Sequence, residues 1–223
     1  MSYRSAYLGK GKGLLLTLGA LKPDGGINYK EIRKYDEKQI EEEYMIKHGD
    51  LLVGMTDLTS GTKMLGSPLL TPCLNSDKVS CVHHFCILRR KEDSYLSNGF
   101  FYFLFKQRHF KEMMNKIATG TTVRQINAQN IAEYLFIVPP KEIALKIQHI
   151  FDNVLNMIEI LDKESIFLEQ IRDSLLPKLL SGEIRVKVDF EKEFPEQIKK
   201  FEEIKKEKVK KTRKFLEGIK HDK

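Results

Sequence analysis

Residues 141–181 read KEIALKIQHIFDNVLNMIEILDKESIFLEQIRDSLLPKLLS, and their pattern indicates one long helix. Its apolar residues recur mostly every three or four positions, which is the period of one helix face, with one wider gap after Leu161. A continuous helix of this length extends about 60 Å, too far to lie within a domain of this size. We therefore expect a long projecting α-helix that pairs with another helix as a coiled coil.

The apolar seam of this helix needs a partner, either the tail of the same chain or a second copy. Pro177 should kink the helix or end it locally because proline has no N–H to donate, and Ser181-Gly182 supplies a stop signal. We expect two copies to pair antiparallel. The residues expected to form this seam are Ile143, Ile147, Ile150, Val154, Met157, Leu161, Leu168, Ile171, Leu175 and Leu179.

The residues before the helix alternate between strand-like and helical patterns. Strand-length apolar runs lie at 14–16, 51–53, 79–88 and 135–138, and helical patterns lie at 37–46, 96–117 and 128–134, the last with Asn127 as its N-cap. We expect an α+β protein in three parts. These are a mixed α/β domain over 1–138, the long helix over 139–182, and a strand-like linker with a basic amphipathic tail over 183–223.

The charge balance makes a polyanion a reasonable first partner to consider. The chain has 223 residues with 38 Lys and Arg against 31 Asp and Glu, a net charge of +7. Eleven of the bases but only six of the acids follow residue 194, so the rest of the chain is close to neutral. A nucleic-acid face on the domain must therefore come from a local arrangement of side chains.

The chain has no run of about 18 apolar residues, so we expect no membrane-spanning helix. Its first residues lack a signal-peptide cleavage pattern. The three cysteines are an odd number without CxxC spacing, which is typical of reduced thiols. We expect a cytoplasmic protein.

Two loops carry the side chains best suited to contact nucleic acid. Residues 56–63 and 118–127 are rich in hydroxyl, amide and cationic groups, the mixture used for phosphate and base-edge contacts. Arginine reads guanine with two hydrogen bonds, and Asn or Gln reads adenine in the same way. A solvated hairpin and a helix-capping loop are the alternative interpretations.

The loop candidates for DNA binding are Thr56, Thr59, Ser60, Thr62, Lys63, Thr119, Thr121, Thr122, Arg124, Gln125 and Asn127. Further candidates, for phosphate contacts only, are Lys10, Lys12, Arg89 and Arg90.

Signatures of catalysis and metal binding are mostly missing. The cysteines and histidines within 81–86 lack the spacing of a zinc site, and adjacent histidines on a strand point to opposite faces. The nearest nuclease-like pattern joins Asp24 to Glu31, but Arg33 stands where such a site needs lysine. We expect no catalytic residue and no metal ligand, although a small Mg²⁺-dependent nuclease remains a third hypothesis.

Five short motifs occur in a specific order. They are GINY at 26–29, HGDLL at 48–52, GTT at 120–122 continuing to Asn127, IVPP at 137–140 and LLPKLLSGE at 175–183. Their order and spacing across residues 9–186 resemble the DNA-specificity (S) subunit of type I restriction-modification systems. The resemblance is to a single target-recognition domain with the helix that follows it.

The resemblance implies a non-catalytic reader of double-stranded DNA that recognises one half of a split target. Its helix would dock a DNA-methyltransferase subunit, with a restriction or translocase subunit as a further partner. That methyltransferase binds S-adenosylmethionine and needs Asn or Asp, two prolines and an aromatic residue. The VPPK segment at 138–141 lacks both flanking residues, so no cofactor is expected on this chain.

Typical family members carry two recognition domains in a chain about twice as long, whereas this chain has one set. The chain is therefore either a natural half-length subunit, which would pair as a homodimer through the long helix, or a fragment of a two-domain chain. The alternative class is a coiled-coil scaffold or adaptor without sequence-specific DNA binding.

Overall fold

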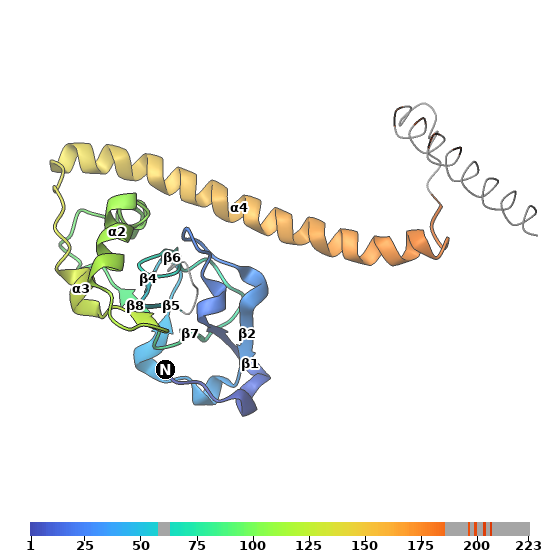
Figure 1. Cartoon of the computed structure of the whole chain (residues 1–223), viewed down its shortest axis with the longest axis horizontal. Coiled ribbons are helices and arrows are strands. Elements are labelled where there is room, and N and C mark those ends of the chain that lie inside the picture. Colours follow the sequence, from blue (N-terminus) through green and yellow to red (C-terminus); the bar gives the residue numbers. More distant parts are fainter. Residues whose placement is uncertain (58–62, 186–195, 197–198, 200–202, 204–205, 207–223) are drawn as a thin grey trace, which may run out of the picture. The chain divides into compact units, whose positions relative to one another are not determined.

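The computed structural model describes residues 1–57 and 63–185, together with 196, 199, 203 and 206. The described chain forms two compact units, Met1–Lys163 and Glu164–Lys223. Short sheets and helices make up the first unit, so the expected α+β class is confirmed (Figure 1). The boundary between the two ranges falls within the sequence of the long helix, and the expected functional division at 139 stays a prediction.

The first sheet has the strand order β2-β1-β7-β3. Its strands are β1 (Leu8–Leu16), β2 (Ile32–Tyr35), β3 (Met45–Ile46) and β7 (Val79–Cys81). β1 runs antiparallel to β2 and parallel to β7. Leu15, Leu16 and Tyr35 are buried in the core beneath this sheet.

The second sheet has the order β6-β4-β8. Its strands are β4 (Leu51–Gly54), β6 (Pro68–Leu70) and β8 (Phe85–Leu88). The 51–53 run is fully buried, as expected for an apolar central strand. The predicted strand at 79–88 is in fact two strands, β7 and β8, because the chain turns at Val82–His84 and the two strands enter different sheets.

The third sheet is a ribbon of two short strands, β5 (Thr56–Asp57) and β9 (Arg124–Gln125). β5 follows β4 after one residue, and β9 lies between helices α2 (Arg108–Ile117) and α3 (Ala128–Ala132).

The prediction of one helix over 96–117 is wrong, because two helices occupy this stretch. α1 (Asn98–Phe105) ends at Lys106, and α2 begins after Gln107. The rings of Phe105 and Phe110 stack across the break with centroids 4.3 Å apart, so both helices bury their aromatic residues in one core. Because the apolar periodicity continues through the break, the sequence pattern does not indicate where the first helix ends.

Two further sequence predictions are wrong. Residues 37–46 form two 3₁₀ turns, η4 (Glu37–Gln39) and η5 (Glu42–Tyr44), followed by β3, because the Asp36 side chain accepts the Lys38 N–H and starts a turn there. Residues 135–138 form no strand, and Leu135 and Ile137 are 88% and 94% exposed. An apolar run without a neighbouring strand has no ladder to join.

The long helix is confirmed as α4 (Lys141–Leu180). Pro177 lies inside it, one turn before its end, and the Ser181 N–H donates to the Pro177 carbonyl. The stop follows at Gly182, which has a φ of +76°. No strand forms over 183–185, while residues 186–188 and most of the tail lie outside the described residues.

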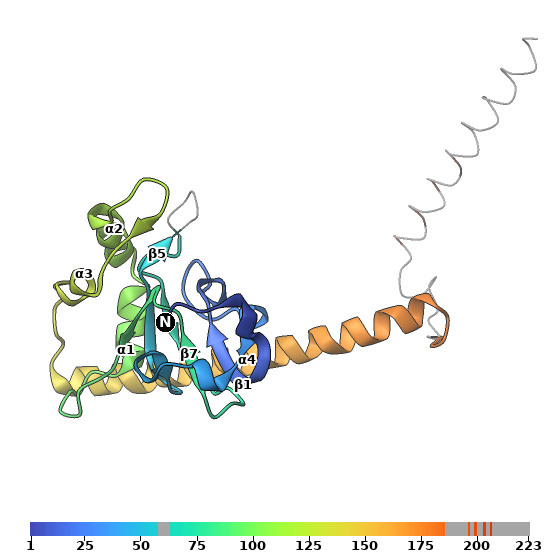
Figure 2. The same ribbon diagram turned by 90° about the horizontal axis from the view of Figure 1, so that it is seen from below.

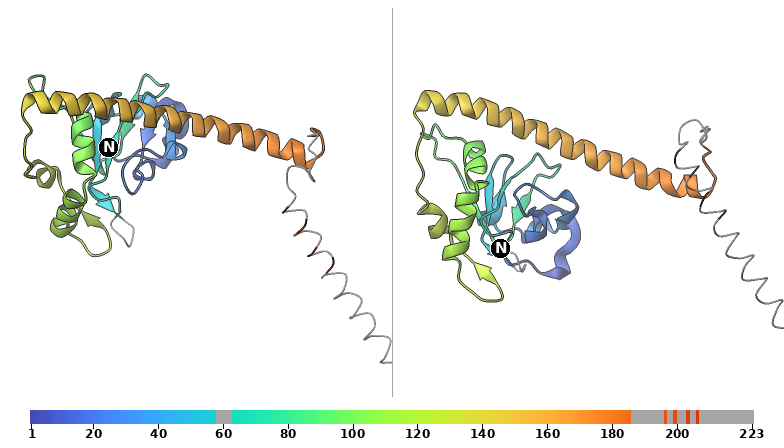
Figure 3. Two further views of the ribbon diagram at one scale, coloured as in Figure 1. Left: turned by 90° about the horizontal axis from the view of Figure 1, so that it is seen from above. Right: turned by 45° about the horizontal axis from the view of Figure 1, so that its top comes forward.

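Residues 141–163 of α4 belong to the first unit and pack on the rest of it, so the helix does not project over this part (Figures 1 and 3). The Phe151 ring lies 4.3 Å from the Phe103 ring of α1. Asp162 pairs with Lys22 at 3.4 Å, and Glu159 accepts the Cys73 N–H at 3.2 Å. In the described part of the chain, no helix is apolar enough over a sufficient length to cross a membrane.

Candidate nucleic-acid interface

The β5–β9 ribbon joins the start of the first predicted loop to the second loop. Thr56 pairs with Gln125 and Asp57 with Arg124, although 67 residues or more separate the partners in the sequence. β5 begins the first loop and β9 lies within the second. Figures 2 and 3 show β5 on the side of the first unit that faces away from residues 141–163 of α4. The ribbon and this part of the helix therefore occupy opposite sides of the unit.

The second loop is a backbone-paired turn with exposed side chains, in which the Thr119 hydroxyl also donates to the Gln125 carbonyl at 3.5 Å. Thr119 and Gln125 exchange both backbone hydrogen bonds, at 2.9 and 3.0 Å. Between them Gly120 has a φ of +94°, and a Cβ at this position would lie 2.0 Å from the Val123 carbonyl oxygen. The side chains of Thr121, Thr122 and Gln125 are exposed, as a base or phosphate contact requires.

Arg124 is engaged within the protein. Its Nη2 donates to the carbonyl of Asn115 at 2.6 Å and of Ala118 at 3.2 Å, so the guanidinium closes the C-terminal end of α2. Its Nε and the Asn115 Oδ1 are buried without a hydrogen-bond partner among the described residues. A direct guanine contact by Arg124 stays a prediction, and a contact that uses Nη2 would require these bonds to break.

Asn127 caps a helix, as its sequence position predicts. Its side chain accepts the Asn130 N–H at 2.9 Å, and the Asn130 side chain accepts the Asn127 N–H at the same distance. This reciprocal pair fixes the start of α3 directly after the ribbon.

The side chains of β5 point into the protein. Thr56 Oγ1 lies 2.6 Å from His84 Nδ1, and buried Asp57 accepts the Met64 N–H at 2.6 Å. Burial, followed by the charge on His83, lowers the pKa of His84, so its ring stays neutral as a partner for Thr56. The candidate Thr56 thus supports the ribbon, and its side chain is only 7% exposed.

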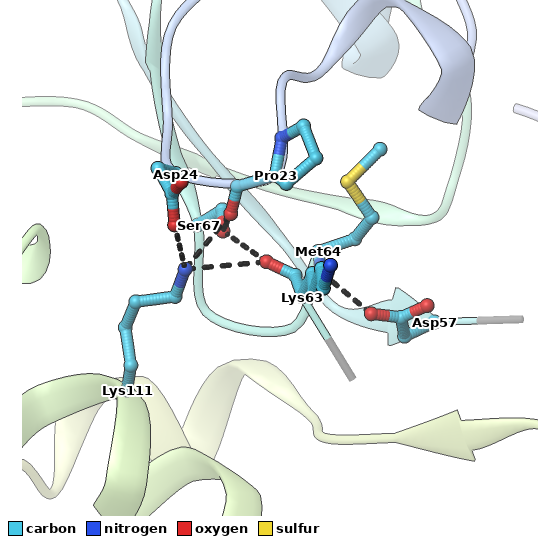
Figure 4. A network of polar contacts seen from close by, with 7 residues as sticks. All are labelled: Pro23, Asp24, Asp57, Lys63, Met64, Ser67 and Lys111. Atoms are coloured by element: carbon cyan, nitrogen blue, oxygen red, sulfur yellow. Dashed lines mark hydrogen bonds and ion pairs between the residues drawn. The ribbon is translucent and has the colours of Figure 1, made fainter. Parts of the chain in front are cut away.

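A network that the sequence did not predict lies at the base of the first loop (Figure 4). Lys111 of α2 donates to the carbonyls of Pro23 at 2.8 Å and Lys63 at 3.2 Å, and it lies 3.4 Å from Asp24 Oδ1. Buried Ser67 places its Oγ within 2.8 Å of the same two carbonyls. The pattern of an amphipathic helix predicts a solvated side chain for a lysine, so no sequence signal indicates these contacts of Lys111.

Other loop candidates are only partly located. Lys63 is exposed at the end of the first loop, and Thr119 is exposed at the start of the second. Thr59, Ser60 and Thr62 lie outside the described residues.

The four additional phosphate candidates are not joined to the ribbon. Leu88 pairs with Leu51 and Phe85 with Gly54, so Arg89 and Arg90 follow the end of the β4–β8 ladder opposite the ribbon. Arg89 donates to the Met45 carbonyl and pairs with Asp50 at 3.6 Å. Lys10 and Lys12 are exposed on β1, whose ladders run to β2 and β7. Their role in phosphate binding stays a prediction.

The nuclease hypothesis receives no geometric support. Asp24 pairs with Lys111, whereas Glu31 pairs with Arg33. Within residues 1–57 and 63–185, no three metal-ligating side chains gather. Burial raises the pKa of the Cys81 thiol to about 12 and also raises that of Cys86, which makes both poor ligands and nucleophiles.

The predicted seam of α4 is a face separate from the one that packs on the domain. The side chains turned to the domain are Ala144, Gln148, Phe151, Leu155, Glu159 and Asp162, all buried or half-buried. The seam lies roughly a third of a turn around the helix, and all its residues except Ile147 are exposed. Its pairing with another helix is not part of this single-chain structure and stays a prediction.

Comparison with known proteins gives the class. Residues 10–170 match the family model described as the type I restriction modification DNA specificity domain, and the chain belongs to this family. This is the specificity component of such systems, a non-catalytic subunit, so the resemblance inferred from the motifs is confirmed.

Individual relatives cover only parts of the chain. Over 115 residues the chain is 32% identical to the type I restriction enzyme MjaIX specificity subunit of Methanocaldococcus jannaschii, which covers 49% of this chain and 24% of that protein. The chain thus spans about a quarter of this relative's length. A solved structure, from work on complex assembly and conformational transition of the type I R-M system, has 16% identity and a TM-score of 0.46, covering 79% of this chain and 41% of that chain.

Proposed function

We propose that this chain binds double-stranded DNA sequence-specifically and reads one half of a bipartite target as the specificity subunit of a type I restriction-modification complex. The single observation that carries the proposal is the β5–β9 ribbon, which pairs the first two residues of one polar loop with two residues of the other. A two-stranded ribbon fits the major groove, where each base pair presents a distinct pattern of donors and acceptors.

The exposed groups of the ribbon are suited to this task. Thr119, Thr121 and Thr122 offer hydroxyls to phosphates or bases, and Gln125 offers an amide with the geometry to read adenine. Lys63 adds a cation at the other loop. Arg124 and Asn127 act mainly by holding the loop between α2 and α3, since their polar groups already bind backbone and neighbouring side chains.

The exposed seam of α4 supports pairing of two copies. Because the seam and the domain-facing stripe lie on different sides of the helix, pairing does not compete with packing on the domain. Two antiparallel copies would present two identical readers to inverted half-sites. The same helices would recruit the adenine-methyltransferase subunit, which would bring S-adenosylmethionine, and the restriction subunit. The complex would act on DNA in the cytoplasm.

Selection of duplexes from a random-sequence library by the full-length chain tests the DNA proposal. We expect one enriched motif, and we expect Gln125→Ala to weaken binding to it by about 1–3 kcal/mol in a mobility-shift assay. Gln129→Ala, an exposed amide on α3 outside the ribbon, is the matched control. Equal affinity for all duplexes would refute sequence-specific reading.

Sedimentation of two α4 variants tests the pairing proposal. Met157→Glu places a charge on the seam at a residue that is 64% exposed, and Leu145→Glu places one off the seam at a residue that is 48% exposed. We expect only Met157→Glu to shift the chain from dimer to monomer. A monomeric wild type, or equal effects of both variants, would contradict the pairing. A dimer without salt-dependent DNA binding would instead support the scaffold alternative.

A further inference from the structure

We infer that Lys111 is a positioning residue for DNA sequence discrimination, which it controls by holding three segments at or beside the proposed interface at fixed spacing without touching the DNA. This inference rests on the proposed function. The three segments are the turn at residues 22–26, the end of the first loop at Lys63, and helix α2, which leads into the second loop.

The contacts of Lys111 use its full capacity. An ammonium group has three N–H donors, and here three acceptors lie within 3.4 Å of Nζ: the carbonyl oxygens of Pro23 and Lys63 and a carboxylate oxygen of Asp24. The side chain is 19% exposed, whereas that of Asp24 is 96% exposed. The two carbonyl contacts are therefore the shielded ones, and the ion pair with Asp24 contributes little.

The Ser67 Oγ also lies near both carbonyl oxygens, 2.6 Å from that of Pro23 and 2.8 Å from that of Lys63, so its single O–H donates to one or is shared between the two (Figure 4). Ser67 is fully buried. The turn is bonded a second time through its Gly26 N–H, which donates to the Pro68 carbonyl at 2.9 Å. The end of the first loop and the 22–26 turn thus form one joined unit, and Lys111 fastens this unit to α2.

Helix α2 connects the contacts of Lys111 to the second loop. Lys111 lies near the start of α2, and Arg124 binds the carbonyls at its end. A helix is stiff over this distance, about 10–15 Å. The relative position of the two loops is therefore set at one end of α2 by Lys111 and at the other by Arg124. Base-edge contacts discriminate only when donors and acceptors are in register, so a loss of spacing reduces specificity more than overall affinity.

Lys111→Met tests this inference, because methionine keeps the apolar stem and removes the ammonium group. Lys116→Met removes the same charge from an exposed residue of α2 and is the matched control. The DNA probes are the duplex enriched by the wild-type chain and a scrambled duplex of equal length. We expect Lys111→Met to lower the affinity ratio between them about tenfold, with an unchanged salt slope, and Lys116→Met to leave the ratio as it is.

Hydrogen exchange of the free chain gives a readout that does not involve DNA. In Lys111→Met the amides of Gly26 and Met64 should exchange faster, and in Lys116→Met they should not. If Lys111→Met does not fold, Ser67→Ala tests the same two carbonyls, with a smaller loss of specificity expected.

The outcomes separate the two proposals. A wild-type chain that enriches no sequence refutes the proposed function. Hydrogen exchange then decides whether Lys111 holds the 22–26 turn and Lys63 in place. A specific wild type whose affinity ratio survives Lys111→Met overturns the inference. A salt slope reduced by about one, with both affinities lowered alike, shows a phosphate contact and also overturns it.

Discussion

Replacing Arg124 with alanine should reduce stability, and the structure allows the size of this effect to be worked out. Nη2 donates to two carbonyls at the end of α2, at 2.6 and 3.2 Å. A hydrogen bond from a charged group contributes about 1.5–3 kcal/mol, and the positive charge at the helix C-terminus adds about 0.3–1 kcal/mol. The buried Nε, which has no partner among the described residues, offsets about 1–2 kcal/mol of this gain.

With both hydrogen bonds counted, the expected net loss for Arg124→Ala is therefore about 2–5 kcal/mol, or roughly 4–20 °C in Tm for a chain of this size. Thermal and urea unfolding of the wild type and Arg124→Ala give this value directly. Gln125→Ala is the control, because that side chain is exposed on the same strand. An unchanged Tm combined with weakened binding to the selected duplex would refute the capping role and restore Arg124 as a base reader.

Three further predictions follow from the same structure. Because burial lowers the pKa of His84 below its ordinary value of 6.5, the unfolded chain takes up the proton first, and stability should fall as the pH drops below about 6.5; urea unfolding at pH 8 and pH 5 should show a smaller loss in His84→Gln. A thiol reagent should label only Cys73 in the native chain and all three cysteines after denaturation, as measured by mass spectrometry, since Cys81 and Cys86 are buried with raised pKa values. Gly120→Ala should lower the free energy of unfolding in urea by about 1–3 kcal/mol and weaken specific binding, because the added Cβ would meet Val123. Gly49→Ala is the control and should lower the free energy of unfolding less, since Gly49 has a positive φ but nothing within 4 Å of an added Cβ. Equal losses would contradict the crowding at Val123.

Local patterns in the sequence predicted the parts of the fold that depend on local interactions. The period of three and four residues identifies α4 over its whole length, and Asn127 identifies the start of α3. The break between α1 and α2 escaped prediction because Phe105 and Phe110 continue the apolar pattern while packing on each other across it. Residues 135–138 have the composition of a strand, but a strand also needs a neighbour, which no local pattern supplies.

For the candidate site too, local features could be predicted from the sequence and pairings between distant residues could not. The chemistry of the loops was visible in their threonines and amides, and their pairing was not, because each strand of the ribbon is only two residues long and its partner lies far along the chain. The roles of Thr56, Arg124 and Lys111 depend on which carbonyl or ring lies beside them in space. Residue type alone gives a list of possible contacts with DNA, and the structure shows which of these groups already have a partner in the protein.

The backbone pairing of the ribbon affects which substitutions this chain can accept during evolution. Its ladder and the turn at Thr119–Gln125 are joined by backbone atoms, which every residue except proline supplies. The exposed side chains of Thr121, Thr122 and Gln125 therefore contribute little to folding. Substitutions at these positions are expected to leave the core intact, so new target preferences can arise by drift at the loop tips at little risk to the fold.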